Sequence, residues 1–155
     1  MLTFFHSTGT LGRKVLRLLD SELSDLANAR LLNAKDCLLQ ANALLNVEQY
    51  KGVANRAYYA VFHAMRAALA LEGFDSKKHS GIIAKFREAY IKTNLFNVEI
   101  SEIISTLFRV RSASDYDDFY ILSKEEAIKQ LESAKMMVVE IESFILGSNL
   151  NHPGA

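Results

Sequence analysis

Cysteine, proline and tryptophan are scarce in this sequence, and neither sign of charge is in excess. The single cysteine, Cys37, excludes an internal disulfide and a zinc site built from several cysteines, and it favours a reducing cytoplasm. Eighteen basic residues balance eighteen acidic ones, so no overall field attracts nucleic acid or an anionic membrane. Any contact with RNA therefore has to be local.

Long hydrophobic runs are also missing. No apolar stretch approaches the roughly 18 to 20 residues of a membrane span, and the N-terminal MLTFFHSTGTLGRK lacks the basic start and apolar core of a signal peptide. We therefore expect a cytoplasmic protein without membrane contact. One proline and seven glycines among 155 residues are too few breakers for a many-stranded β fold.

The chain instead carries helical periodicity along most of its length. Apolar residues recur at spacings of three and four, which predicts one all-α domain over 11–147, after a flexible lead-in at 1–10 and before a frayed tail at 148–155. The expected helices cover 11–45 with a break near 20–24, about 50–72, 80–92, 98–112 and 123–147. Short connections between them favour an antiparallel bundle of four to five helices.

The second expected helix contains NRAYYAVFHAMR, residues 55–66. Asn55, Tyr59, His63 and Arg66 follow helical spacing and share one face. One interpretation is that these aromatic side chains pack in the core or at an interface. The other is a surface on which a ligand or an RNA base stacks.

A second candidate is SKKHSG, where His79 follows two lysines near the start of a helix. Free N–H groups and nearby cations suit a phosphate there; the alternative is a solvated loop histidine. Because no histidine pair has helical spacing and no second cysteine exists, we expect no metal site and no cofactor.

The third candidate is FRVRSASDYDDFY, residues 108–120. Arg109 and Arg111 suit the carbonyl end of a helix, and Asp115, Asp117 and Asp118 suit a turn or partners for arginine. Three neighbouring carboxylates do not make a metal cage without further oxygen ligands.

Four segments taken in order resemble the HEPN superfamily, in particular its branch of small prokaryotic proteins. They are NRAYYAVFHAMRAAL, KKHSGIIAKF, RSASDYD and EEAIKQLESAKMMVVEIESFI, and the resemblance covers about 26–146. It implies a bundle of four or five helices that forms a homodimer with a cleft at the interface. It also implies pairing with a minimal nucleotidyltransferase, as toxin and antitoxin or as a substrate-binding partner, with Tyr116 as a modification site in that pairing.

Active members of that superfamily cleave RNA without a metal, using an arginine followed shortly by a histidine. Arg111 matches the arginine, and Tyr116 stands at the histidine position. A tyrosine, with a reference pKa near 10, is a poor general base at neutral pH, so ordinary ribonuclease chemistry is not implied. His79 is the candidate to replace the histidine.

Three functions follow from this resemblance. The first is a dimeric module that binds a nucleotide, RNA or a partner nucleotidyltransferase. The second is a metal-independent endoribonuclease using Arg111 with His79 or Tyr116, and the third is a purely structural dimerisation module. The expected ligand-binding residues are Asp115, Arg109, Tyr59, His63 and Arg56.

Overall fold

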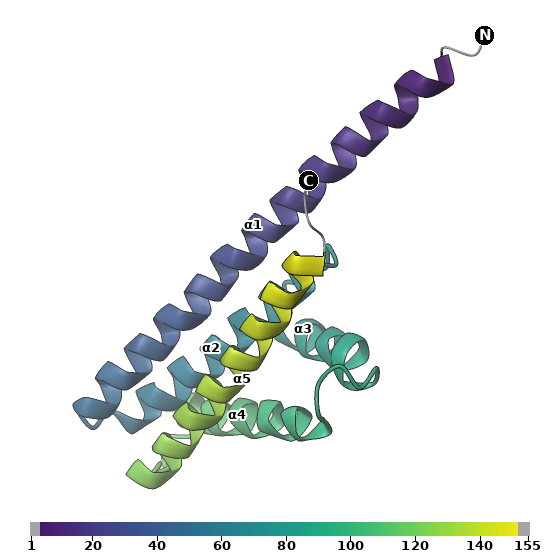
Figure 1. Ribbon diagram of the computed structural model, residues 1–155. Coiled ribbons are helices and arrows are strands. Elements are labelled where there is room, and N and C mark those ends of the chain that lie inside the picture. The colour runs from purple at the N-terminus through teal and green to yellow at the C-terminus, as the bar shows by residue number, and fades with distance from the viewer. Residues whose placement is uncertain (1–3, 152–155) are drawn as a thin grey trace.

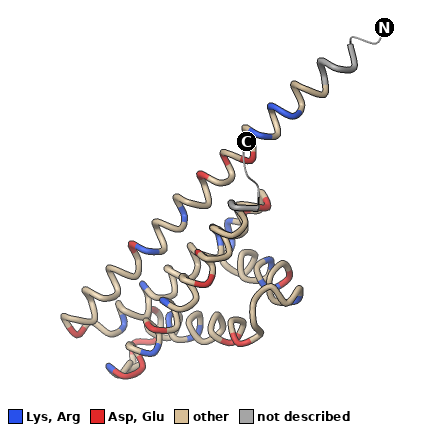
Figure 2. Tube along the Cα trace, viewed as in Figure 1, with Lys and Arg blue, Asp and Glu red and all other residues tan. Residues whose placement is uncertain are grey.

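The computed structural model describes the backbone of residues 4–151 and the side chains of residues 9–148. Within that part the chain is all-α and has no strand (Figure 1). The helices are α1 (Phe4–Asn46), α2 (Tyr50–Ala70), α3 (His79–Phe86), the π-helical turn η1 (Arg87–Ile91), α4 (Val98–Tyr116) and α5 (Lys124–Asn151). The all-α bundle predicted from the sequence is confirmed. Basic residues lie on every helix, whereas acidic residues lie on α1, η1, α4 and α5 and are absent from α2 and α3 (Figure 2).

The expected break near residues 20–24 is wrong, because α1 is one continuous helix of 43 residues. Serine and aspartate at those positions can cap a new helix, but inside a helix each costs only a few tenths of a kcal/mol. No glycine or proline lies between Gly12 and Asn46. α1 begins at Phe4, inside the expected lead-in, and α5 ends at Asn151, inside the expected tail. Most of those two segments lies outside the described side chains.

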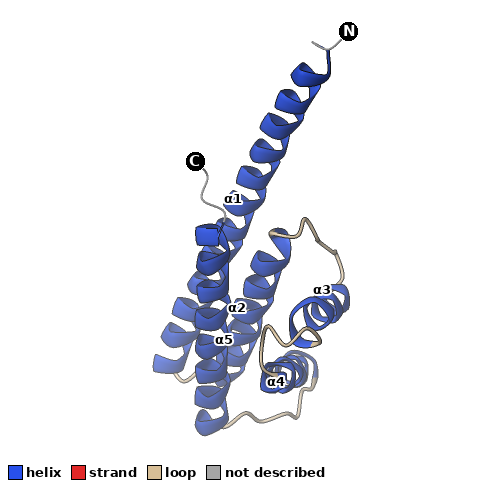
Figure 3. Ribbon diagram, turned by 45° about the vertical axis from the view of Figure 1, so that its right-hand side comes forward, coloured by secondary structure: helices blue, strands red, loops and turns tan. Residues whose placement is uncertain are grey.

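α2 is the central helix. It packs against α1, α3, α4 and α5, and α1, α2 and α5 run alongside one another while α3 and α4 lie to one side of them (Figure 3). Fully buried alanines such as Ala57, Ala64 and Ala68 let the neighbouring helices approach closely. Tyr90 of η1 donates a buried hydrogen bond of 3.0 Å to the Ala68 carbonyl, which joins the η1 turn to α2.

Two helix ends have residues that suit them. Gly73 after α2 has φ +70°, a left-handed conformation that glycine adopts without strain. At α5 a capping box is present: Ser123 Oγ accepts from Glu126 N at 3.1 Å, and Glu126 Oε2 accepts from Ser123 N at 3.1 Å. Among the described residues no helix is long and apolar enough to cross a membrane.

Candidate functional site

Arg111 lies on α4, on the side that faces α2. Its Nη2 donates a hydrogen bond of 2.9 Å to the Tyr59 hydroxyl. Its Cζ lies 5.0 Å from the ring centroid of Tyr58 and 5.3 Å from that of Tyr59, within the range of cation–π attraction. Only 12% of the side chain is exposed, so two consecutive tyrosines of α2 hold the guanidinium in place.

Asp115, one helical turn further along α4, balances this charge. Its Oδ2 lies 3.1 Å from Arg111 Nε, but Nε lacks the geometry of a hydrogen bond, so the contact is an ion pair only. Asn55 Nδ2 donates to both carboxylate oxygens, at 3.3 and 3.0 Å. The carboxylate therefore bridges α4 to the start of α2.

Arg56 brings a second cation to the same side. It donates to the Asn55 Oδ1 atom at 2.9 and 2.6 Å, and its Cζ lies 5.1 Å from the Tyr59 ring centroid. Asn55 thus links Arg56 to Asp115, and the Tyr59 ring lies within cation–π distance of both arginines.

His79, the first residue of α3, reaches the same tyrosines. Its Nδ1 lies 3.0 Å from the Tyr58 hydroxyl oxygen, and its ring stacks on Phe62 with centroids 4.1 Å apart. Because Tyr58 occupies Nδ1, Nε2 is the ring nitrogen left for a ligand. Arg111 and His79 therefore converge on Tyr58, a contact that sequence spacing did not predict. We name the set Tyr58, Tyr59, Phe62, His79 and Arg111 the Arg111 site.

Burial controls the protonation of these groups. It raises the pKa of Tyr58 to about 12, so the phenol keeps its proton at neutral pH. Burial, followed by the charges of Arg111 and Arg66, lowers the pKa of His79 below its ordinary 6.5. The imidazole is therefore mostly neutral at pH 7, the form that accepts a proton.

The loop before α3 sets the position of His79. Asp75 accepts hydrogen bonds from Arg66 and from Arg30, at 3.0 and 2.8 Å. Ser76 Oγ accepts from Lys78 N at 3.2 Å. These bonds hold the loop at Asp75, Ser76 and Lys78, directly before His79.

His63 lies on the predicted face of α2, with its ring centroid 6.3 Å from that of Tyr59. Its buried Nδ1 has no hydrogen-bond partner among the described residues. Burial, followed by the charges of Arg66, Arg56, Arg30 and His79, lowers its pKa below 6.5. His63 therefore lies next to the Arg111 site but makes no described contact with Arg111.

Tyr116 and Arg109 are placed differently from Arg111. α4 continues to Tyr116 instead of ending near Ser112, so Tyr116 is helical. The Tyr116 residue is 77% exposed. Its ring centroid lies 5.9 Å from Arg111 Cζ. Arg109 is exposed and makes no hydrogen bond or ion pair with the described residues.

Three residues that contact this site were missing from the predicted set of site residues: Asn55, Tyr58 and Phe62. Helical spacing singled out Asn55, but not its contact with Asp115.

The Arg111 site contains no carboxylate or histidine cluster of the kind that binds a metal. Among the described residues, no three His, Cys, Asp or Glu side chains gather in that way. A surface hollow of about 370 Å³ lies elsewhere, between α4 and α5, and is lined by Glu99, Glu102, Ile103, Thr106, Leu107, Gln130 and Ser133. None of the predicted site residues lines it.

Comparison with known proteins agrees with the sequence resemblance. The family model described as "HEPN domain" matches residues 27–143. "Putative toxin MJ0142" of Methanocaldococcus jannaschii is 31% identical over 117 residues, which cover 76% of this chain and 80% of that protein. A "UPF0332 protein" of Thermotoga maritima is 31% identical over 112 residues, covering 72% of this chain and 85% of that protein. A "UPF0332 protein" of Archaeoglobus fulgidus is 31% identical over 121 residues, which cover 78% of this chain and 96% of that protein.

Proposed function

Because this chain belongs to the HEPN domain family, we propose that its Arg111 site binds RNA or a nucleotide, and that the protein is the toxin of a toxin–antitoxin pair. The toxin role rests on the names of two relatives, both from Methanocaldococcus jannaschii. The observation that carries the binding role is the guanidinium of Arg111 held between Tyr58 and Tyr59.

Arg111 has binding capacity left. A guanidinium carries five N–H donors in a planar fork that fits phosphate, and among the described residues this one donates a single hydrogen bond, to Tyr59. Asp115 is its competitor, since a phosphate has to displace or share the ion pair. Tyr116, largely exposed and next to Arg111, offers a ring on which a base stacks.

Exposed apolar side chains near Tyr116 support the expected homodimer. Large apolar side chains lie exposed around the end of α4 and the following turn: Phe108, Tyr116, Phe119 and Ile121. Exposed apolar patches of this kind are typical of protein interfaces. A second copy that covers them would enclose the Arg111 site at the interface, and a nucleotidyltransferase partner would compete for the same patch.

RNA binding is tested by Arg111→Ala, with Arg109→Ala as the matched control. The probe is a fluorescently labelled single-stranded RNA, followed by anisotropy in EDTA. Loss of charge-assisted hydrogen bonds predicts affinity lower by about tenfold or more for Arg111→Ala, and little change for the exposed Arg109→Ala. Equal losses in both would indicate non-specific charge attraction. Unchanged RNA binding in Arg111→Ala would contradict the assignment of the Arg111 site. The structural dimerisation module would then be the remaining function.

The convergence of His79 on this site favours a second function, metal-independent cleavage of RNA. In such a reaction the 2′-hydroxyl oxygen attacks phosphorus and the bond to the 5′ oxygen breaks, leaving a 2′,3′-cyclic phosphate and a 5′-hydroxyl. His79 is the proposed carrier of the proton from the 2′-hydroxyl to the leaving oxygen, and Arg111 stabilises the charge on the phosphate.

The cleavage proposal predicts cyclic-phosphate products in EDTA. They should fall by about 100-fold or more in His79→Ala and persist in Tyr116→Phe, which keeps the ring but removes the hydroxyl. Loss in Tyr116→Phe alone would assign the proton transfer to Tyr116. RNA left intact by the unmodified protein from about pH 5 to pH 8 would rule out cleavage and leave binding untouched.

A further inference from the structure

The N-terminal half of α1 stands clear of the bundle. Residues 9–26, named here the α1 extension, project beyond the other helices (Figures 1 and 3). Among the described side chains of α1, from residue 9 onward, the first buried one is Ala27, and the match to the family model also begins at residue 27. At 1.5 Å per residue the α1 extension is about 27 Å long, so a large helical surface lies outside the domain.

One side of the α1 extension is apolar. Leu16, Leu19, Leu23 and Leu26 follow spacings of three, four and three, the pattern of a coiled-coil seam. Leu16 is 61% and Leu19 49% exposed. At helical spacing the row continues into Arg30, which faces α2. The side of α1 that packs in the bundle is half-buried at Leu23 and exposed at Leu16, Leu19 and Leu26.

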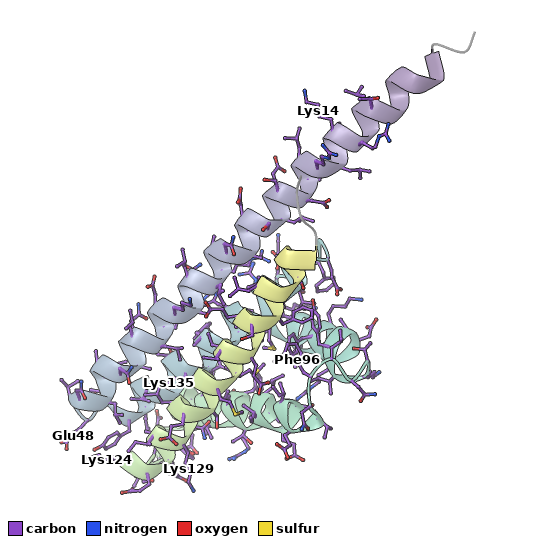
Figure 4. The ribbon with its side chains drawn as sticks, viewed as in Figure 1. Lys14, Glu48, Phe96, Lys124, Lys129 and Lys135 are labelled. Atoms are coloured by element: carbon purple, nitrogen blue, oxygen red, sulfur yellow. The ribbon has the colours of Figure 1, made fainter. Side chains whose placement is uncertain are left out.

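Charge on the α1 extension is segregated. Arg13, Lys14 and Arg17 form a basic block nearer the N-terminus, and Asp20, Glu22 and Asp25 form an acidic block nearer the bundle. Figure 2 shows blue followed by red along this part of α1, and Lys14 extends from the helix into open space in Figure 4. These six side chains make no ion pair with one another in the described part of the chain.

We propose that the α1 extension pairs antiparallel with the α1 extension of a second copy. A two-fold axis between the charged blocks puts the basic block of each copy beside the acidic block of the other and brings the leucine rows together. Parallel pairing would put like charges together. The net charge of the α1 extension is zero, so an anionic membrane surface is not attracted to it. The pairing is separate from the Arg111 site, which α2, α3 and α4 form.

Charge reversal tests the direction of pairing. One variant changes the basic block to glutamate, a second changes the acidic block to lysine, and a third carries both sets; each is measured by sedimentation velocity on the full chain. The two single-block variants should lose the pairing through the α1 extension, which halves the mass of the wild-type assembly whether or not the copies also associate beside the Arg111 site. The doubly reversed chain should regain that mass, since opposite charges again face each other. A wild-type monomer at micromolar concentration, unchanged mass in the single-block variants, or no recovery in the third would overturn the proposal.

Leucine substitution tests the apolar row. Leu16→Gln combined with Leu19→Gln should weaken self-association by at least about a hundredfold, while glutamine keeps helix propensity. The matched control is Leu32→Gln with Leu39→Gln, 63% and 67% exposed on the bundle half of α1, and it should keep the wild-type mass. Equal effects in the two pairs would overturn the proposal. RNA affinity of the Arg111 site, measured alongside, should not depend on whether the α1 extensions pair.

Discussion

Asp75 and Asp115 are both carboxylates paired with arginine beside α2, one near the end of the helix and one near its start. Asp75 accepts hydrogen bonds from two arginines, Arg66 and Arg30. The hydrogen bond from Arg66, helped by the Ser76 backbone N–H and by the charges of both arginines, holds the pKa of its carboxyl below the usual 3.8. Asp115 accepts hydrogen bonds from the Asn55 amide and pairs with Arg111 only as an ion contact.

The two clusters differ in the arginine N–H donors that remain for a ligand. Arg30 is 7% exposed and uses Nη1 on the Arg66 carbonyl and Nη2 on Asp75, at 3.1 and 2.8 Å. That arginine is committed to holding α1, α2 and the loop before α3 together. Arg111, with one donated hydrogen bond and an aromatic surround, retains capacity for a ligand. The first cluster is therefore expected to govern stability, and the second to govern binding.

The largest expected effect comes from breaking the Asp75 cluster. Arg30→Ala removes a buried cation and takes one side-chain donor away from the Arg66 carbonyl. It should lower the free energy of unfolding by about 2–3 kcal/mol, at the low end for buried pairs because the Asp75 side chain is 49% exposed. Urea unfolding measures the change.

Arg109→Ala is the control for Arg30→Ala, since Arg109 is exposed and exposed substitutions shift stability by about 0.5 kcal/mol or less. If Arg30→Ala changed stability no more than this control, the cluster would not hold the loop. Arg111→Ala should change the free energy of unfolding by an amount between those of Arg30→Ala and Arg109→Ala. Its larger effect should be on RNA affinity.

A smaller effect is expected where the loop meets α3. A methyl group on Gly81 would lie 2.5 Å from Ser76 Oγ, the atom that accepts from Lys78 N. Gly81→Ala should therefore destabilise by about 1 kcal/mol, the strain exceeding the gain in helix propensity. In a Ser76→Gly background the same change should become stabilising, because the clash is gone. If Gly81→Ala changed stability equally with and without Ser76→Gly, the contact with Ser76 Oγ would not limit the side chain at position 81.

Sequence periodicity was sufficient for the bundle but not for two helix ends. The break expected near residues 20–24 rested on capping residues, which permit a helix start without requiring one. The end expected near Ser112 rested on the arginines at a carbonyl end. α4 instead continues because Asp115 pairs with Arg111 four residues earlier, a spacing that stabilises a helix, and also receives Asn55 from α2.

The site was predictable only as far as single helices allow. Helical spacing grouped Tyr59 with His63, and the family resemblance singled out Arg111. The approach of His79 to Tyr58 depends on how the loop at Asp75 folds back onto α2, which no spacing along the chain encodes. The contact of Asn55 with Asp115 joins residues 60 positions apart and was likewise out of reach.

The smallest predicted effect is a pH dependence from His63, which lies between the two clusters. Its pKa is lowered in the folded state from 6.5 by burial and by the charges of Arg66, Arg56, Arg30 and His79. Above about pH 6.5 the imidazole is neutral in both folded and unfolded chains, so stability is unaffected. As the pH falls below that value the unfolded chain binds a proton that the folded chain does not, and stability falls until the folded pKa is reached.

His63→Gln removes this titration and keeps a polar side chain. Urea midpoints at about pH 5, 6, 7 and 8 should therefore show a shallower loss of stability below pH 6.5 in the variant than in the wild type. Carboxylates add losses of the same sign at lower pH, but they are common to both proteins and cancel in the difference. Parallel curves for the two proteins would mean that His63 titrates alike in the folded and unfolded chains.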